Sequence, residues 1–225
     1  MFVQHSLYHE VKRRICYIIF ISVLFLCEDI NAQKKIEDDM EHNRIIFSAA
    51  TTSDTYLLEM GYHYMFSNYV GVGGTFGFWK VFSSGGRASG KGWWVDDDYN
   101  DPSNVYIKPS VILKSPQLSI FSLYAEPGIM LNVPYHMAYV ELTDQFPHCE
   151  YERISTNKGQ WLALELRAGI SADFSSFGIT LGYLMSNLDP FSMYRHMSYN
   201  GVSFQSFYRK KSFRQGAFIS ASFSF

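Results

Sequence analysis

The stretch FSMYRHMSYNG, from Phe191 to Gly201, holds the residue pair most able to do covalent chemistry. His196 and Ser198 are two residues apart, so their side chains share one face if the segment is a β-strand. An imidazole beside a hydroxyl can act as the general base for a nucleophile. Such a base is normally oriented by a carboxylate, and the sequence has no Asp or Glu after Asp189. We therefore keep hydrolysis only as an alternative function.

A second stretch, VDDDYND, places Asp96, Asp98 and Asn100 at the first, third and fifth positions of a calcium-binding loop. The sixth position of that loop should be Gly, and the twelfth should be Glu. Here they are Asp101 and Ile107. An acidic, solvated loop tip is the better interpretation.

His136 and the adjacent pair His148-Cys149 are of the residue types that bind zinc. Adjacent ligands without a second spaced pair form no recognised zinc site. We predict a surface loop here, and neither a metal nor a cofactor for the protein.

The amino terminus has the features of an export signal. Three basic residues, from Lys12 to Arg14, precede an apolar run from Ile15 to Cys27 that is too short for a transmembrane helix. We predict a secretory signal peptide over residues 1–32, a short periplasmic segment over 33–43, and one domain over 44–225. An uncleaved anchor, a buried core helix and a lipoprotein signal at Cys27 remain alternatives.

Composition limits the possible partners and the class of protein. The formal net charge is −2, which provides no basic field to attract nucleic acid. Cys149 is the one thiol outside the predicted signal, so the exported chain would have no internal disulfide. Aromatic residues make up 17 % of the chain and charged residues only 18 %. Either a soluble exported domain or a membrane β-barrel is compatible with these values.

Alternation of apolar and small or polar residues separates the two classes when it is combined with loop lengths. In the closing segment Ala217, Ile219 and Phe223 share one face, whereas the serines share the other. The pattern predicts eight strands, at about 44–51, 55–66, 69–80, 104–114, 117–132, 160–174, 177–186 and 212–225. From the second strand onward, short and long joints alternate, as in barrels with short periplasmic turns and long outer loops. We predict an all-β, eight-stranded, antiparallel, up-and-down transmembrane β-barrel, with a soluble sandwich as the alternative.

Five charged residues fall on the predicted inner face of this barrel: Glu59, Lys108, Glu126, Glu165 and Arg167. Side chains can fill the interior of an eight-stranded barrel. We therefore expect a packed network of ion pairs, with a narrow or gated conduit as the alternative. Small inward residues, such as Gly73 and Gly77, should leave room for long side chains of neighbouring strands.

Three segments carry a family resemblance: the signal ending NAQ, the hairpin LLEMGYHYMFSNYVGVGGTFGFWK and the closing FRQGAFISASFSF. They resemble the small outer-membrane β-barrel proteins common in Bacteroidetes, related in architecture to the OmpX, OmpW and OmpA barrel domains. The resemblance implies a Gram-negative outer-membrane location. It also implies that the barrel-assembly machinery reads Phe223 and Phe225 as an insertion signal.

The segment FSMYRHMSYNG is similar to the His-x-Ser-Asn stretch of the outer-membrane lipid A deacylases, which use a Ser-His-Glu triad. That similarity would make His196 the base and Ser198 the nucleophile, but Tyr199 stands where that family has Asn.

The remaining expectations concern partners. Arg209, Lys210, Lys211 and Arg214 cluster in YRKKSFR and could pair with lipopolysaccharide phosphates. Trp93 and Trp94 suit an interfacial girdle or a partner surface. We expect a non-enzymatic, monomeric barrel in contact with outer-membrane lipid, which serves envelope integrity or surface interaction. A small-solute porin is a further alternative.

Overall fold

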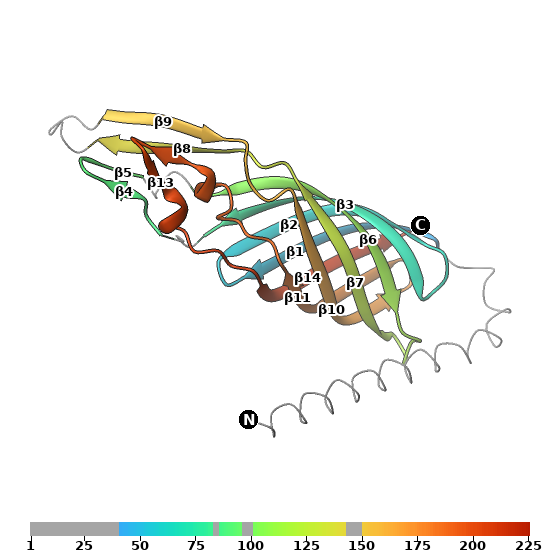
Figure 1. The fold of residues 1–225 in the computed structure, drawn as a ribbon. Helices are drawn as coiled ribbons and strands as arrows, with labels where there is room; N and C mark the ends of the chain where they lie inside the picture. The colour runs from blue at the N-terminus through green and yellow to red at the C-terminus, as the bar shows by residue number, and fades with distance from the viewer. Residues whose placement is uncertain (1–40, 83–85, 96–100, 143–149) are drawn as a thin grey trace, which may run out of the picture. The chain divides into compact units, whose positions relative to one another are not determined.

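The structure, a computed structural model, describes residues 41–82, 86–95, 101–142 and 150–225. The predicted signal peptide and nearly all of the segment 33–43 lie outside the described residues. The chain from Glu41 to Phe225 forms one compact unit, which Figure 1 shows as a ribbon.

Eight antiparallel strands close into a barrel, which confirms the predicted fold class. Their order around the barrel is β1-β14-β11-β10-β7-β6-β3-β2. The strands are β1 (Asn43–Thr52), β2 (Thr55–Met65), β3 (Val70–Val81), β6 (Ser103–Lys114), β7 (Phe121–Asn132), β10 (Leu162–Phe174), β11 (Phe177–Ser186) and β14 (Arg214–Ser224). Closure joins the first strand to the last, with Arg44 opposite Ser224 and Thr52 opposite Gly216. Among the described strands, closure leaves the barrel sheet without an open edge, whose unpaired backbone groups would be costly in hydrocarbon.

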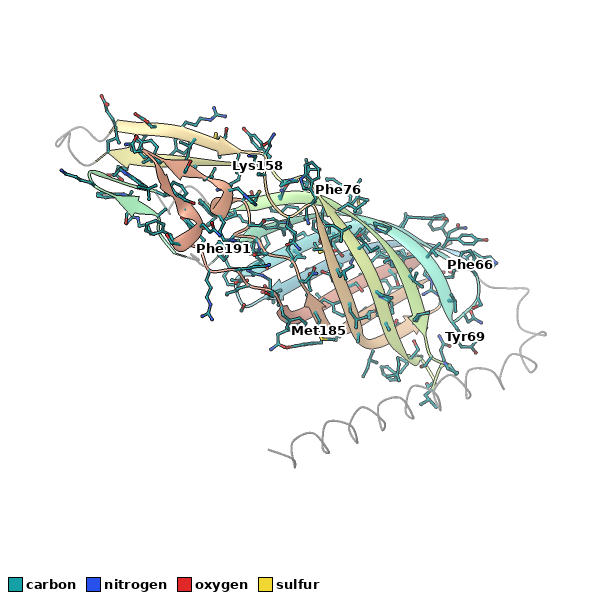
Figure 2. All side chains as sticks on the ribbon, in the orientation of Figure 1. Phe66, Tyr69, Phe76, Lys158, Met185 and Phe191 are labelled. Carbon is teal, nitrogen blue, oxygen red and sulfur yellow. The ribbon has the colours of Figure 1, made fainter. Side chains whose placement is uncertain are left out.

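The outer surface of the barrel is apolar. Outward side chains of β2, including Leu58 and Met60, are 53 % and 55 % exposed, whereas Glu59 between them is 6 % exposed. The other barrel strands repeat this alternation, and Phe66 and Phe76 stand on the outside in Figure 2. The apolar exterior predicted from the sequence is thereby confirmed.

Short and long joints define two ends of the barrel. Residues 66–69, 115–120 and 175–176 connect strands at the short-turn end. The segments 82–102, 133–161 and 187–213 leave from the long-loop end, as does the two-residue joint Ser53-Asp54 between β1 and β2. One boundary differs clearly from the prediction, because β7 begins at Phe121 and not near residue 117. Ser119 has a φ of 63°. This is a turn conformation, so β7 cannot extend back to residue 117.

The pairing of β6 with β7 has gaps. Tyr106 pairs with Asn132 at one end, and Lys114 pairs with Tyr124 at the other. Both strands advance by eight residues between these two pairs (114 − 106 and 132 − 124), so the register does not change. Between them, Pro109 and Pro127 form no pair across this seam. The missing proline N–H groups therefore interrupt the ladder without inserting a residue.

The long loops contain a second sheet that the sequence analysis did not predict. Its order is β4 (Ser89–Gly90), β5 (Trp93–Val95), β8 (His136–Leu142) and β9 (Glu150–Thr156). In Figure 1 this sheet lies beyond the end of the barrel that is opposite the C-terminus. The third long loop adds η3 (Tyr194–His196), β12 (Ser198–Tyr199), β13 (Val202–Ser203) and η4 (Phe204–Ser206).

An aromatic cluster joins the sheet to the third loop. Trp93 is 3 % exposed and lies 5.1 Å from the ring of Tyr199 and 5.8 Å from that of Phe204. Trp94 donates a hydrogen bond to Glu141 at 2.9 Å. The expectation of a membrane-interface girdle is therefore wrong for Trp93, because its ring fills a core between loops. We call the second sheet (β4, β5, β8 and β9) together with the third long loop (residues 187–213) the loop platform.

Candidate functional site

The five charged residues predicted for the interior meet in one cluster, which we call the central cluster. Glu59 comes from β2, Lys108 from β6, Glu126 from β7, and Glu165 and Arg167 from β10. Each is between 1 % and 6 % exposed. Alternation along the strands turns these side chains inward, because their outward neighbours are apolar.

Lys108 lies at the centre of the carboxylates. Its Nζ is 2.9 Å from Glu165 Oε1, 3.1 Å from Glu59 Oε1 and 3.4 Å from Glu126 Oε1. Gly128 provides room for this side chain, since a Cβ there would lie 3.1 Å from Lys108 Cγ and Cδ.

Arg167 completes the cluster. Its guanidinium is 2.7 Å from Glu59 and 2.9 Å from Glu165, and it donates to the Ser48 hydroxyl at 2.8 Å. The ring of Phe218 lies 5.3 Å from the guanidinium carbon. Two cations thus pair with three carboxylates in a space with little water, where pairing with good geometry is required.

Two tyrosines and one histidine supplement the pairs. Tyr106 donates to Glu59 at 2.6 Å, Tyr124 donates to Glu126 at 2.8 Å, and His63 Nε2 lies 4.0 Å from Glu126 Oε1. These phenols were not identified as partners from the sequence. The signal that could have found them is their inward position in strands whose other inward residues are acidic.

Inward glycines of β3 make the space for two of these side chains. A Cβ at Gly77 would lie 2.2 Å from Tyr106 Cζ, and one at Gly73 would lie 2.1 Å from His63 Cδ2. The expected exchange of small for large residues across β3 is confirmed.

Further ion pairs occupy both ends of the interior. At the short-turn end Lys114 is 2.8 Å from Asp173, which also accepts from Arg44 at 3.4 Å. At the long-loop end Asp54 pairs with Lys211 at 2.5 Å and with Arg214. Arg214 is 2 % exposed, so its predicted place in a surface cation cluster is wrong. It is the first inward residue of β14, and Asp54 holds it inside.

A cavity of about 10 Å³ lies between the central cluster and the short-turn end, among His63, Lys114 and Tyr124. This is at most the space of about one water molecule. At this level, side chains and not solvent fill the barrel.

His196 and Ser198, the possible base and nucleophile, do not share one strand face as expected. His196 ends η3, whereas Ser198 begins β12, so the two residues do not share a strand face. The reason is local: Asn200 and Gly201 have φ of 47° and 78°, the conformation of a two-residue hairpin turn. The hairpin that this turn forms is short, and its first paired residue is Ser198. His196 therefore lies outside the strand. Both side chains are exposed, and no bond between them is formed in the described part of the chain.

The metal candidates are only partly described. Asp96, Asp98, Asn100, His148 and Cys149 lie outside the described residues. His136 is not at the surface as expected: it is 6 % exposed, with its ring 4.6 Å from that of Tyr194. Burial lowers its pKa to about 4. Among the described residues no group of three or more His, Cys, Asp or Glu could hold a metal ion.

A closed, eight-stranded antiparallel barrel with apolar residues outside and ion pairs inside is an integral outer-membrane β-barrel. Within the described residues, no helix is both long and apolar enough to cross a bilayer.

Solved structures of outer-membrane proteins are similar to this chain to different degrees. A major outer membrane protein from Thermus thermophilus is 12 % identical, with a TM-score of 0.51 over 81 % of this chain and 98 % of that one. Neisserial surface protein A is 13 % identical, with a TM-score of 0.43 over 81 % and 94 %. The outer membrane enzyme PagL is 11 % identical, with a TM-score of 0.35 over 81 % and 99 %. At these identities the likeness concerns the fold alone. No protein-family model and no curated protein match the chain.

Proposed function

We propose that this protein is a non-enzymatic, non-conducting barrel that serves envelope integrity and presents the loop platform for surface interaction. The observation that carries the proposal is the central cluster. Its side chains come from four strands and meet at 2.7 to 3.4 Å across the interior. A permanent water path would need these pairs to separate, and each stranded charge would be costly.

The short turns then face the periplasm and the loop platform faces the cell exterior, as is usual for such barrels. The resemblance of the hairpin and closing segments supports a Bacteroidetes-type protein. The exposed rings of Phe223 and Phe225, at 46 % and 62 %, support the proposed recognition by the assembly machinery. A monomer is consistent with a sheet that closes on itself.

Planar-bilayer recording tests the proposal. The purified protein, shown to be folded by heat-modifiable migration in gels, should give no stable single-channel steps, while an open porin in the same bilayers does. Reproducible steps from folded protein would favour the porin alternative and contradict the filled interior.

The lipid A deacylase alternative requires Ser198 to act as a nucleophile. Membranes from cells that produce the wild type and Ser198→Ala should contain lipid A of identical mass. Loss of an acyl chain with the wild type alone would contradict the non-enzymatic role.

A further inference from the structure

A groove of about 770 Å³ runs along the outside of the barrel at β6, β7, β10 and β11. Most of its lining side chains point outward and are apolar. They are Pro109, Val111, Pro127, Ile129, Leu164, Leu166, Met185 and Phe213. A groove of this size and apolar character is typical of a small-molecule site. Because it lies on the lipid-facing surface, hydrocarbon is the chemistry that fits it.

The interrupted seam between β6 and β7 is part of the groove, because Pro109 and Pro127 both line it. Ser110 and Glu165, 7 % and 3 % exposed, reach the groove from the inner side. The Ser110 hydroxyl and Glu165 Oε2 are buried without a hydrogen-bond partner among the described residues. Ser110 of β6 and Glu165 of β10 thus place two polar atoms on the inner side of the apolar lining.

A polar pocket of about 360 Å³ adjoins the groove at the long-loop end. Asn187 lines both spaces, and Phe213 of the groove directly follows Ser212 of the pocket. The two spaces therefore meet where the barrel passes into the loops. The pocket is formed mainly by the segment 187–212 of the third long loop.

Positive charge predominates in this pocket. Its charged lining residues are Arg195, Lys210, Lys211 and one carboxylate, Asp189. Asp189 binds Arg195 at 2.5 Å, and Asp54, outside the pocket, binds Lys211 at 2.5 Å. Lys210 is exposed and has no ion pair within the part of the chain that is described. One lysine charge thus remains for an anion.

We propose that the groove and the pocket together bind one lipid molecule, with an acyl chain in the groove and a phosphate-bearing headgroup beside Lys210. Apolar surface at the depth of the hydrocarbon and net positive charge at the rim match the two ends of such a lipid. The site lies on the outside of the barrel, so it is independent of whether the interior conducts.

Native mass spectrometry of the full-length protein in detergent tests this site with dioleoyl phosphatidic acid and dioleoyl phosphatidylcholine. The phosphatidic acid should bind about fivefold more tightly, as expected for one lysine near a membrane surface. Lys210→Glu should abolish this preference. Lys91→Glu, an exposed lysine between β4 and β5, should retain it.

Leu164→Trp tests the groove. It should weaken the binding of both lipids several-fold, because the larger side chain fills the space. Leu58→Trp is its matched control: both leucines are 53 % exposed, and β2 stands opposite β10 in the barrel. Heat-modifiable migration identifies variants that have folded. Equal binding of the two lipids by wild type, or unchanged binding by folded Leu164→Trp, would overturn the proposal.

Discussion

Arg167 and Glu59 form a 2.7 Å ion pair although their strands, β10 and β2, stand on opposite sides of the barrel. Four steps separate the two strands in either direction around the closed sheet. The pair therefore spans the full width of the interior. It links two walls that share no backbone hydrogen bond.

Replacing Arg167 by Met should lower the free energy of unfolding by about 3 to 5 kcal/mol, because Glu59 loses a partner in a buried site. Urea unfolding in lipid vesicles measures this change. Arg209→Met, an exposed control, should change stability by less than about 0.5 kcal/mol. Adding Glu59→Gln to Arg167→Met should recover part of the loss. Equal stability of wild type and Arg167→Met would show that the pair contributes nothing.

Gly77 and Gly74 provide a steric test within one strand. A Cβ at Gly77 would lie 2.2 Å from the ring of Tyr106, whereas one at Gly74 would meet nothing within 4 Å. Gly77→Leu should reduce stability by about 1 to 3 kcal/mol or more by displacing Tyr106 from Glu59. Gly74→Leu should fold normally, because its side chain enters lipid. The heat-modifiable fraction and the urea midpoint report both variants, and identical behaviour would contradict the inward assignment of Gly77.

His136 should make the loop platform sensitive to acid. Its pKa of about 4 in the folded state lies below the ordinary value of 6.5. The unfolded segment therefore binds a proton first as the pH falls. The contribution of His136 to the stability of the loop platform should be complete above pH 6.5 and should decline between about pH 6.5 and 4. The full loss, reached below pH 4, should be about 3 kcal/mol.

Hydrogen exchange of the β8 amides, corrected for intrinsic rates, follows this decline. His136→Phe should flatten it, since a phenyl ring does not titrate. A decline of equal size in His136→Phe would assign the effect to other groups.

Phe225 should affect assembly more than stability. Its ring is 62 % exposed and lies outside β14, although its backbone N–H donates to Asn43 at 3.0 Å. Phe225→Ala keeps that hydrogen bond. It should reduce the amount of folded barrel in cell membranes several-fold while refolding in detergent proceeds with normal yield. If both yields fell together, the ring would act in folding itself.

Much of the barrel was predictable, because a two-residue alternation is written directly into each strand. Glu59 between Leu58 and Met60 is enough to define which side faces lipid. The same alternation identified the five charged residues of the central cluster. It could not show which of them pair, since pairs such as Arg167 with Glu59 depend on the curvature of the closed sheet.

The loop platform was not predictable for a related reason. Trp93 packs on Tyr199 and Phe204, which are more than a hundred residues away in the sequence. No local period marks such contacts. The placement of Arg214 failed similarly: a run of cations indicates a surface, and only Asp54, from another joint, makes one of them internal.

The pairing of β1 with β14 has a consequence for biogenesis. Asn43–Thr52 finds its second neighbour only in Arg214–Ser224, so the cylinder cannot be sealed until nearly the whole domain has been translated and exported. Contacts of such large sequence separation form slowly. We therefore expect the newly exported polypeptide to remain unfolded and prone to aggregation, so that it needs a periplasmic chaperone before insertion.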